Sequence, residues 1–336
     1  MLSYYLLVPL AFLLSFVCVW LILRLPASWI ALDRPNNRSL HQTPTPRLGG
    51  VAILVGIILP FGVYVSLGEI HSEFVFIIIS LVLVAGISLV DDFYSISFLI
   101  RITIHIIAAI LIVNSGHTIA DINTDWGDIT LPIYIAVPIS ILFIVWMINL
   151  YNFMDGIDGL AGGMAVIGFG TFATIGFMEG HFAFAISALV IASSVLGFLV
   201  WNYPPARIFM GDSGSSSLGL LAAAFSLWAD VNELIPIWMS VVIFSPFIVD
   251  ATVTLIIRII KRERFWDAHK SHYYQLVAES GLSRRKLLLY EYMLMLVCSS
   301  VAIFSYDASI GLQISGMLVL AILFLILMRY ARKMSV

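Results

Sequence analysis

The feature that most constrains this fold is a series of apolar runs, most of them long enough to cross a bilayer. About 17–25 apolar residues suffice to span some 30 Å of hydrocarbon. The sequence contains eleven such runs, of which the fourth and eighth are short, at about 3–24, 49–67, 74–90, 99–114, 131–148, 160–178, 182–200, 216–229, 236–257, 287–305 and 309–328. Because 61% of the residues are hydrophobic and only 11% are charged, a soluble globular domain is excluded. The sequence predicts an all-α polytopic membrane protein.

The distribution of positive charge predicts how these helices are oriented. Lys and Arg concentrate in the cytoplasmic loops of membrane proteins. With the N-terminus outside, all 17 Lys and Arg residues fall on the inner face, while the outer loops carry only acids and His. One wrong helix count would scatter the basic residues over both faces. We therefore expect eleven helices, a periplasmic N-terminus and a cytoplasmic C-terminus.

Nothing in the sequence indicates a second domain. No repeat or low-complexity tract is present, so residues 1–336 are expected to form a single integral membrane domain. Its first run is expected to be a retained helix, because no basic segment precedes it and no cleavage site follows. Cys18 and Cys298 lie within runs and predict packing residues without a disulfide. Polar loops are expected at about 25–48, 91–98, 149–160, 201–215 and 258–286.

Two adjacent carboxylates, Asp91 and Asp92, end the third predicted helix. Neighbouring carboxylates repel each other unless a cation or a proton lies between them. Negative charge is also unfavourable at a helix C-terminus. A solvated helix end would explain the pair by itself, but the other loops on the same face repeat this chemistry. The pair therefore predicts a site for a cation.

The loop after the fifth predicted helix has polar residues at every third position, at Asn149, Asn152, Asp155 and Asp158. Gly156 and Gly159 permit tight turns and close approach of a ligand to the backbone. Two amides followed by two carboxylates suit a polar ligand that carries a cation. A Gly-rich turn capped by Asn and Asp is the structural alternative.

The segment before the eighth predicted helix contains Asn202, Phe209 and the run Gly211-Asp212-Ser213-Gly214. Free N–H groups at a helix N-terminus favour anions such as phosphate. Asp212 would repel an anion, and a bridging Mg²⁺ would reconcile the two. An Asp or Ser that merely caps the helix is the alternative.

The most basic loop contains His269 and His272, which share a face if the segment is helical. No third ligand follows for zinc, and Lys270 lies between them. Oxyanion contacts at a phosphate therefore suit this segment better than a metal. Two surface histidines without a function remain the alternative.

The first inner loop contributes Arg38 and Arg47, whose guanidinium groups suit bidentate contacts with phosphate. Gly49-Gly50 would let helices pack closely. Within the predicted spans, Asp250 is costly to bury and is expected to line the same site. His105 is expected to be a buried, hydrogen-bonded structural residue.

Together these segments resemble the polyprenyl-phosphate N-acetylhexosamine-1-phosphate transferases, glycosyltransferase family 4, which begin lipid-linked glycan and peptidoglycan synthesis. The motifs follow the family's order from Asp33 to Tyr273. They are Asp91-Asp92, Asn149-x-x-Asn152-x-x-Asp155-Gly-x-Asp158-Gly, Phe209-Met-Gly-Asp212-Ser-Gly and His269-x-x-His272. His-Lys-Ser-His departs from branches with three adjacent histidines. With the Pro-Thr-Pro-Arg-x-Gly-Gly loop, it is most similar to the branch that starts bacterial O-antigen chains.

The resemblance implies a role for each matching residue. Asp212 and Asp92 would hold Mg²⁺, with Mn²⁺ as the alternative ion. The catalytic residues would be Asp91, Asp92, Asp212, His269 and His272. The donor and the phosphates would be bound by Asn152, Asp155, Asp158, Asn202, Phe209, Arg38, Arg47 and Lys270.

The family implies transfer of N-acetylhexosamine-1-phosphate, or of a 6-deoxy relative, from a UDP-sugar to undecaprenyl phosphate, with release of UMP. The site would lie on the cytoplasmic face of the bacterial inner membrane. The acceptor phosphate is largely dianionic at pH 7, so Asp91 would place reactants more than remove a proton. Double displacement through a phosphorylated Asp stays open.

Other functions also remain open from sequence. One is the peptidoglycan enzyme that uses UDP-MurNAc-pentapeptide, and another is a polytopic transporter. Expected partners are the two substrates and membrane lipids, without nucleic acid. The oligomeric state is open, with a homodimer as one option.

Overall fold

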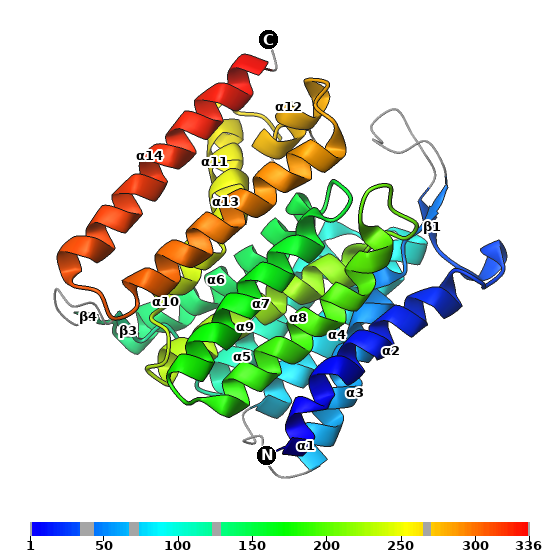
Figure 1. Ribbon diagram of the computed structural model, residues 1–336, viewed down its shortest axis with the longest axis horizontal. Helices are drawn as coiled ribbons and strands as arrows, with labels where there is room; N and C mark the ends of the chain where they lie inside the picture. The colour runs from blue at the N-terminus through cyan, green and yellow to red at the C-terminus, as the bar shows by residue number, and fades with distance from the viewer. Residues whose placement is uncertain (1, 34–43, 67–73, 123–128, 265–269, 335–336) are drawn as a thin grey trace.

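The computed structural model describes residues 2–33, 44–66, 74–122, 129–264 and 270–334. These residues are almost entirely helical, with two short antiparallel hairpins (Figure 1). The helices are α1 (Leu2–Tyr5), α2 (Leu7–Ile22), η1 (Ala27–Trp29), α3 (Gly49–Ser66), α4 (Phe74–Tyr94), α5 (Phe98–Asn114), α6 (Ile133–Met154), α7 (Leu160–Met178), α8 (Phe182–Asn202), α9 (Asp212–Val231), α10 (Ile237–Ile243), α11 (Ser245–Ile260), α12 (Tyr273–Glu279), α13 (Arg284–Ser305) and α14 (Ile310–Met334). The strands are β1 (Leu32–Asp33), β2 (Thr45–Pro46), β3 (Asp121–Ile122) and β4 (Ile129–Thr130).

The apolar runs of the sequence coincide with helices, one run covering the pair α10 and α11. Among the described residues, α4, α6, α7, α8, α13 and α14 are long and apolar enough to span a bilayer. The pair α10–α11 makes a seventh span if the bent pair crosses as one, and α2, α3 and α5 are apolar but shorter. The all-α polytopic class is therefore confirmed. The count of eleven spans and the orientation stay predictions.

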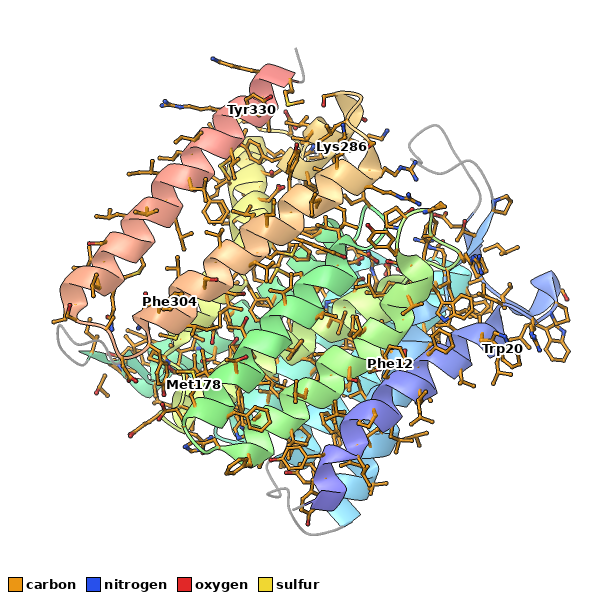
Figure 2. All side chains as sticks on the ribbon, viewed as in Figure 1. Phe12, Trp20, Met178, Lys286, Phe304 and Tyr330 are labelled. Carbon is orange, nitrogen blue, oxygen red and sulfur yellow. The ribbon has the colours of Figure 1, made fainter. Side chains whose placement is uncertain are left out.

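Helix α9 lies at the centre of the bundle, and almost all of its residues are buried. Its Gly, Ala and Ser side chains let neighbouring backbones approach. A Cβ on Gly219 would stand 2.4 Å from the carbonyl oxygen of Met147 in α6. Helix α14 is different, because it lies at the edge of the bundle, with side chains directed away from the other helices (Figure 2). Its Leu318, Val319 and Ile322 are exposed. Apolar side chains on that surface suit contact with lipid.

The β1–β2 hairpin joins the segment before α3 to the segment before α9, because the N–H of Phe209 donates to the carbonyl of Pro46 at 2.7 Å. Leu32 pairs with Pro46, and the chain then continues into α3. The N–H of Gly49 donates to the carbonyl of Phe209 at 2.9 Å, and that of Gly50 to Met210 at 2.7 Å. A Cβ on Gly50 would lie 2.2 Å from the nitrogen of Gly214. The expected close packing at Gly49-Gly50 is confirmed, and it brings two polar loops together.

Two other expectations have definite outcomes. Cys18 and Cys298 are both free thiols, as expected. His105 is buried, but neither of its ring nitrogens has a hydrogen-bonding partner among the described residues, so the expected hydrogen bonding was wrong. The chain also bends by 85° between α10 and α11. Pro246, in the first turn of α11, explains a break there, because proline cannot donate the helical hydrogen bond.

Candidate active site

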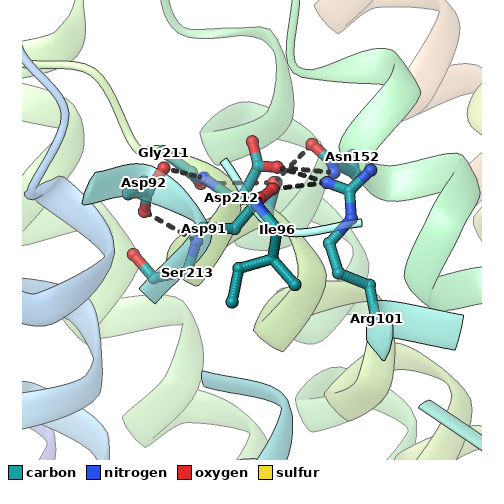
Figure 3. A network of polar contacts seen from close by, with 9 residues as sticks. Asp91, Asp92, Ile96, Arg101, Asn152, Gly211, Asp212 and Ser213 are labelled. Atoms are coloured by element: carbon teal, nitrogen blue, oxygen red, sulfur yellow. Dashed lines mark hydrogen bonds and ion pairs between the residues drawn. The ribbon is translucent and has the colours of Figure 1, made fainter. Parts of the chain in front are cut away.

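The carboxylate of Asp92 caps the N-terminus of α9. Its oxygens accept the N–H of Asp212 at 2.9 Å and that of Ser213 at 3.2 Å (Figure 3). The unfavourable position of Asp92 at the end of α4 is thus offset by the favourable dipole of α9. The expectation of a free phosphate-facing helix terminus needs correction, because the anion at these two N–H groups is the protein's own carboxylate.

Arg101, in the first turn of α5, joins two of the acidic motifs. One guanidinium nitrogen, Nη1, lies 2.6 Å from Asp91 Oδ2 and 3.1 Å from Asp212 Oδ2. The backbone N–H of Ile96 also donates to Asp91. Arg101 therefore supplies a positive charge beside Asp91, and the metal ion expected at the Asp pair stays a prediction. Sequence reasoning used Arg101 only for topology, although a lone arginine at the inner end of an apolar run after an Asp pair was the available signal.

Asn152 brings the end of α6 into the same cluster. Its amide nitrogen donates to Asp212 Oδ2 at 3.3 Å, and its amide oxygen accepts from the hydroxyl of Ser215 at 3.2 Å. Helices α4, α5, α6 and α9 thus place Asp91, Asp92, Arg101, Asn152 and Asp212 together (Figure 3).

The pKa of Asp155, which follows α6, is also affected by the carboxylates of this cluster. Burial raises the pKa of the Asp155 carboxyl well above its usual value, and the nearby Asp212 carboxylate raises it further. The Arg47 guanidinium opposes that rise. Such crowding of carboxylates is what a bound cation would relieve.

The donor set agrees in chemical kind with Mg²⁺, which takes oxygen ligands and few protein carboxylates. Asp92 and Asp212 each offer oxygens, and a carboxylate oxygen can accept more than one partner. The described residues contain no group of three His, Cys, Asp or Glu side chains already arranged around one ion. Asp92 and Asp212 would hold such an ion only together with oxygen ligands from a substrate, such as the oxygens of a diphosphate.

The remaining residues of the Asn/Asp stripe lie elsewhere. The Asn149 amide donates to the carbonyl of Val145 in its own helix at 2.7 Å. Asp158 accepts from the N–H of Ala206 at 3.0 Å and lies 3.7 Å from Arg284. The stripe does not form one surface, because α6 ends at Met154 and the chain turns.

Asn202 connects two of the polar loops. Its side-chain oxygen accepts from the N–H of Gly159 at 2.8 Å, and its amide donates to the carbonyl of Ile208 at 2.8 Å. Gly159 has φ of +81°, a conformation that favours glycine. The hydroxyl of Tyr292 donates to the carbonyl of Gly159 at 2.8 Å. Asn202 thus fixes the loop that follows Asp155, and sequence reasoning missed the part of Tyr292.

The basic loop is only partly described, and Arg38 and His269 lie outside the described residues. Lys270 forms an ion pair with Glu279 at 3.1 Å. His272 is buried, with its Nδ1 3.2 Å from Asp250 Oδ1. Its ring centroid lies 6.2 Å from that of Phe153, the residue after Asn152.

Asp250, which was expected to line the site, lies beside the predicted site residue His272. Its carboxylate is directed at the start of α12, where it accepts the N–H groups of Tyr273 and Tyr274 at 3.0 and 3.1 Å. The depth of Asp250 in its apolar run suggested a lining role, but its carboxylate accepts backbone N–H groups of α12. Phe209 is half-buried, and its backbone N–H donates to Pro46 at 2.7 Å.

A bundle of apolar helices with a cluster of Asp, Asn and Arg at helix ends defines a multi-pass membrane protein suited to phosphate chemistry. Comparison with known proteins agrees. The profile of glycosyl transferase family 4 matches residues 74–230. A probable undecaprenyl-phosphate N-acetylglucosaminyl 1-phosphate transferase from Bacillus subtilis is 32% identical over 298 residues, covering 87% of this chain and 82% of the relative.

Relatives of lower identity carry two different names. A decaprenyl-phosphate N-acetylglucosaminephosphotransferase from Mycobacterium leprae is 29% identical, over 78% of this chain and 74% of the relative. A phospho-N-acetylmuramoyl-pentapeptide-transferase from Staphylococcus carnosus is 28% identical, over 66% and 75%. The chain belongs to glycosyl transferase family 4, as its motifs predicted. It is an enzyme that moves a sugar-1-phosphate onto a polyprenyl phosphate, which excludes the transporter.

Proposed function

We propose that this enzyme transfers N-acetylhexosamine-1-phosphate, or a 6-deoxy relative, from a UDP-sugar to undecaprenyl phosphate. The observation that carries the proposal is the meeting of Asp91, Asp92, Asn152 and Asp212 around Arg101. The names of the Bacillus and Mycobacterium relatives favour N-acetylglucosamine as the sugar. The product would begin a lipid-linked O-antigen or a related envelope polysaccharide.

The proposed topology places this site on the cytoplasmic face of the inner membrane. Eleven crossings with a periplasmic N-terminus put all 17 Lys and Arg residues on that face. The two chain ends lie at opposite ends of the bundle, which accords with an odd number of crossings (Figure 1). The soluble donor would arrive from the cytosol and the acceptor from the bilayer. We keep a homodimer as a prediction.

In the proposed reaction, an oxygen of the acceptor phosphate forms a bond to the sugar-proximal phosphorus. The bond from that phosphorus to the UMP oxygen breaks, and its electron pair leaves with UMP. When bound at Asp212 and Asp92, Mg²⁺ would neutralise charge on the diphosphate and on UMP. Arg101 contacts the carboxylates of both Asp91 and Asp212 and keeps them close together. Asp91 then orients the nucleophile, because a dianionic phosphate has no proton that must be removed.

The other predicted residues fall into two groups in this proposal. Asn152, Asp155 and Arg47 lie where the diphosphate would meet the acidic cluster. Asp158, Asn202 and Phe209 hold the loops that would contact the donor, through their hydrogen bonds to the loop backbone. His269, His272, Lys270 and Arg38 are proposed to contact phosphate oxygens from the basic loops.

UDP-MurNAc-pentapeptide is the second candidate donor, favoured by relatives named phospho-N-acetylmuramoyl-pentapeptide-transferases. A donor panel with membranes that carry the enzyme separates the two. UMP release should depend on undecaprenyl phosphate and should be greatest with UDP-GlcNAc or another small UDP-N-acetylhexosamine. A clear preference for UDP-MurNAc-pentapeptide would overturn the proposal.

The variant test uses Asp212→Asn, with Asp307→Asn as the matched control in an outer loop. Asp212→Asn should abolish UMP release, whereas Asp307→Asn should release UMP at the wild-type rate. Equal activity of the two variants would contradict the assignment of the site.

A further inference from the structure

The carboxylate of Asp250 has four hydrogen-bond partners deep in the protein. It is 8% exposed and lies in α11, after the 85° bend. It accepts from the hydroxyl of Thr254 at 3.2 Å and from the N–H groups of Tyr273 and Tyr274 at 3.0 and 3.1 Å, and it lies 3.2 Å from His272 Nδ1. Three of these four belong to the start of α12. A buried carboxylate requires such partners, and here they fix a neighbouring element.

Helix α12 depends on this carboxylate for its position. It contains only seven residues, Tyr273–Glu279, and helices of this length are marginal without external contacts. A cavity of about 290 Å³ lies beside it, lined in part by Val277, Leu287 and Phe324. Packing on that side is therefore incomplete, and the backbone of the first turn is held by the Asp250 bonds, while Arg332 donates to the hydroxyl of Tyr273 at 2.7 Å.

From α12, Tyr274 reaches the acidic cluster. Its hydroxyl donates to the carbonyl of Phe153 at 3.1 Å, and the side chain is 1% exposed. The same hydroxyl fills the space beside Gly156, where a Cβ would stand 2.0 Å away. Phe153 follows Asn152, whose amide donates to Asp212. A continuous series of contacts thus runs from Asp250 through Tyr274 and Phe153 to Asn152 and Asp212.

We infer that Asp250 is a positioning residue of the transferase, acting through Tyr274 on the turn at residues 152–156. Its carboxylate also lies 3.2 Å from His272 Nδ1, a contact that fixes the orientation of the ring. The expected consequence is selective. The turn at 152–156 is the part of the site proposed to meet the UDP-sugar, so loss of Asp250 should impair use of the donor more than of the lipid acceptor.

The test measures initial UMP release by purified enzyme in detergent, with each substrate varied in turn. Asp250→Asn should lower kcat/KM for the UDP-sugar by about 10–100-fold, the usual range when a partner behind a site residue is removed. KM for undecaprenyl phosphate should stay at the wild-type value. Asp250→Glu, which restores a carboxylate, should recover most of the loss. Thr252→Val is the control, because it removes another bond of α11, the one that Trp146 donates at 3.1 Å.

A second variant keeps the inference testable if Asp250→Asn does not fold. Tyr274→Phe deletes only the hydroxyl that bonds to Phe153, and it should raise KM for the donor in the same direction. In the double variant the two losses should not add, because both act on one series of contacts.

The inference is wrong if Tyr274→Phe leaves donor KM unchanged, if the two losses add in full, or if Asp250→Asn lowers thermal stability alone. It rests on the proposed donor reaction. Failure of that reaction would be distinct, because the wild-type enzyme would then release no UMP.

Discussion

Replacing Arg101 with Met tests whether the acidic cluster is held together by one guanidinium group. Nη1 contacts Asp91 at 2.6 Å and Asp212 at 3.1 Å, and the three side chains are 29%, 11% and 21% exposed. A hydrogen bond to a charged group contributes about 1.5–3 kcal/mol. Partial exposure favours the lower end, so the pair contributes about 3 kcal/mol to the alignment of the two carboxylates. Since 1.36 kcal/mol is tenfold in rate, kcat/KM should fall by about 100-fold.

Lysine at the same position provides the sharper comparison. Both contacts are made by one nitrogen atom of Arg101, and the single ammonium nitrogen of Lys carries three donors. Arg101→Lys should therefore keep most of the activity that Arg101→Met loses. The assay is initial UMP release, with Arg329→Met on the exposed surface of α14 as the control for loss of a positive charge. Activity of Arg101→Met within threefold of wild type, or equal loss in Lys and Met variants, would refute the reasoning.

Three further predictions follow from the same contacts. Asp92→Ala removes two hydrogen bonds from the N-terminus of α9 and should lower the free energy of unfolding by about 0.5–2 kcal/mol, measured as a lower Tm in detergent. An unchanged Tm would contradict the capping role. Gly50→Ala places a Cβ 2.2 Å from Gly214 N and should lower the free energy of unfolding by about 1–3 kcal/mol. In the control Gly86→Ala the new Cβ meets nothing within 4 Å, so stability should be unchanged or slightly higher. Equal effects of the two substitutions on Tm would argue against close contact of α3 and α9. Chelation by EDTA should stop UMP release and added Mg²⁺ should restore it; full activity in EDTA would remove the proposed ion.

The sequence predicted helix positions well, because hydrophobic length is a local property of the chain. The acidic cluster was also accessible, since Asp91, Asp92 and Asp212 stand in recognisable motifs. The role of Arg101 could not be predicted from the sequence, because its contact with Asp212 joins residues 111 positions apart. Its place after the Asp pair distinguished it from the other arginines, but no pattern in the sequence shows that it also contacts Asp212.

Asp250 was recognised from the sequence, but its contacts were not. Its depth in an apolar run predicted a functional carboxylate, but its partners depend on the 85° bend and on where α12 begins. Asp158 and Asn202 were likewise recognised as polar groups at a loop. Their backbone partners, Ala206, Gly159 and Ile208, could not be inferred because they arise only when two loops meet.

The most direct test of the central claim follows the sugar-proximal phosphorus itself. UDP-GlcNAc carrying ³²P at that phosphorus is incubated with the enzyme and undecaprenyl phosphate, and the lipid and aqueous phases are separated. The proposed bond cleavage predicts that the label enters the lipid and that unlabelled UMP appears in equal amount. Label recovered in the aqueous phase as UDP, with the sugar alone on the lipid, would contradict sugar-1-phosphate transfer at this site.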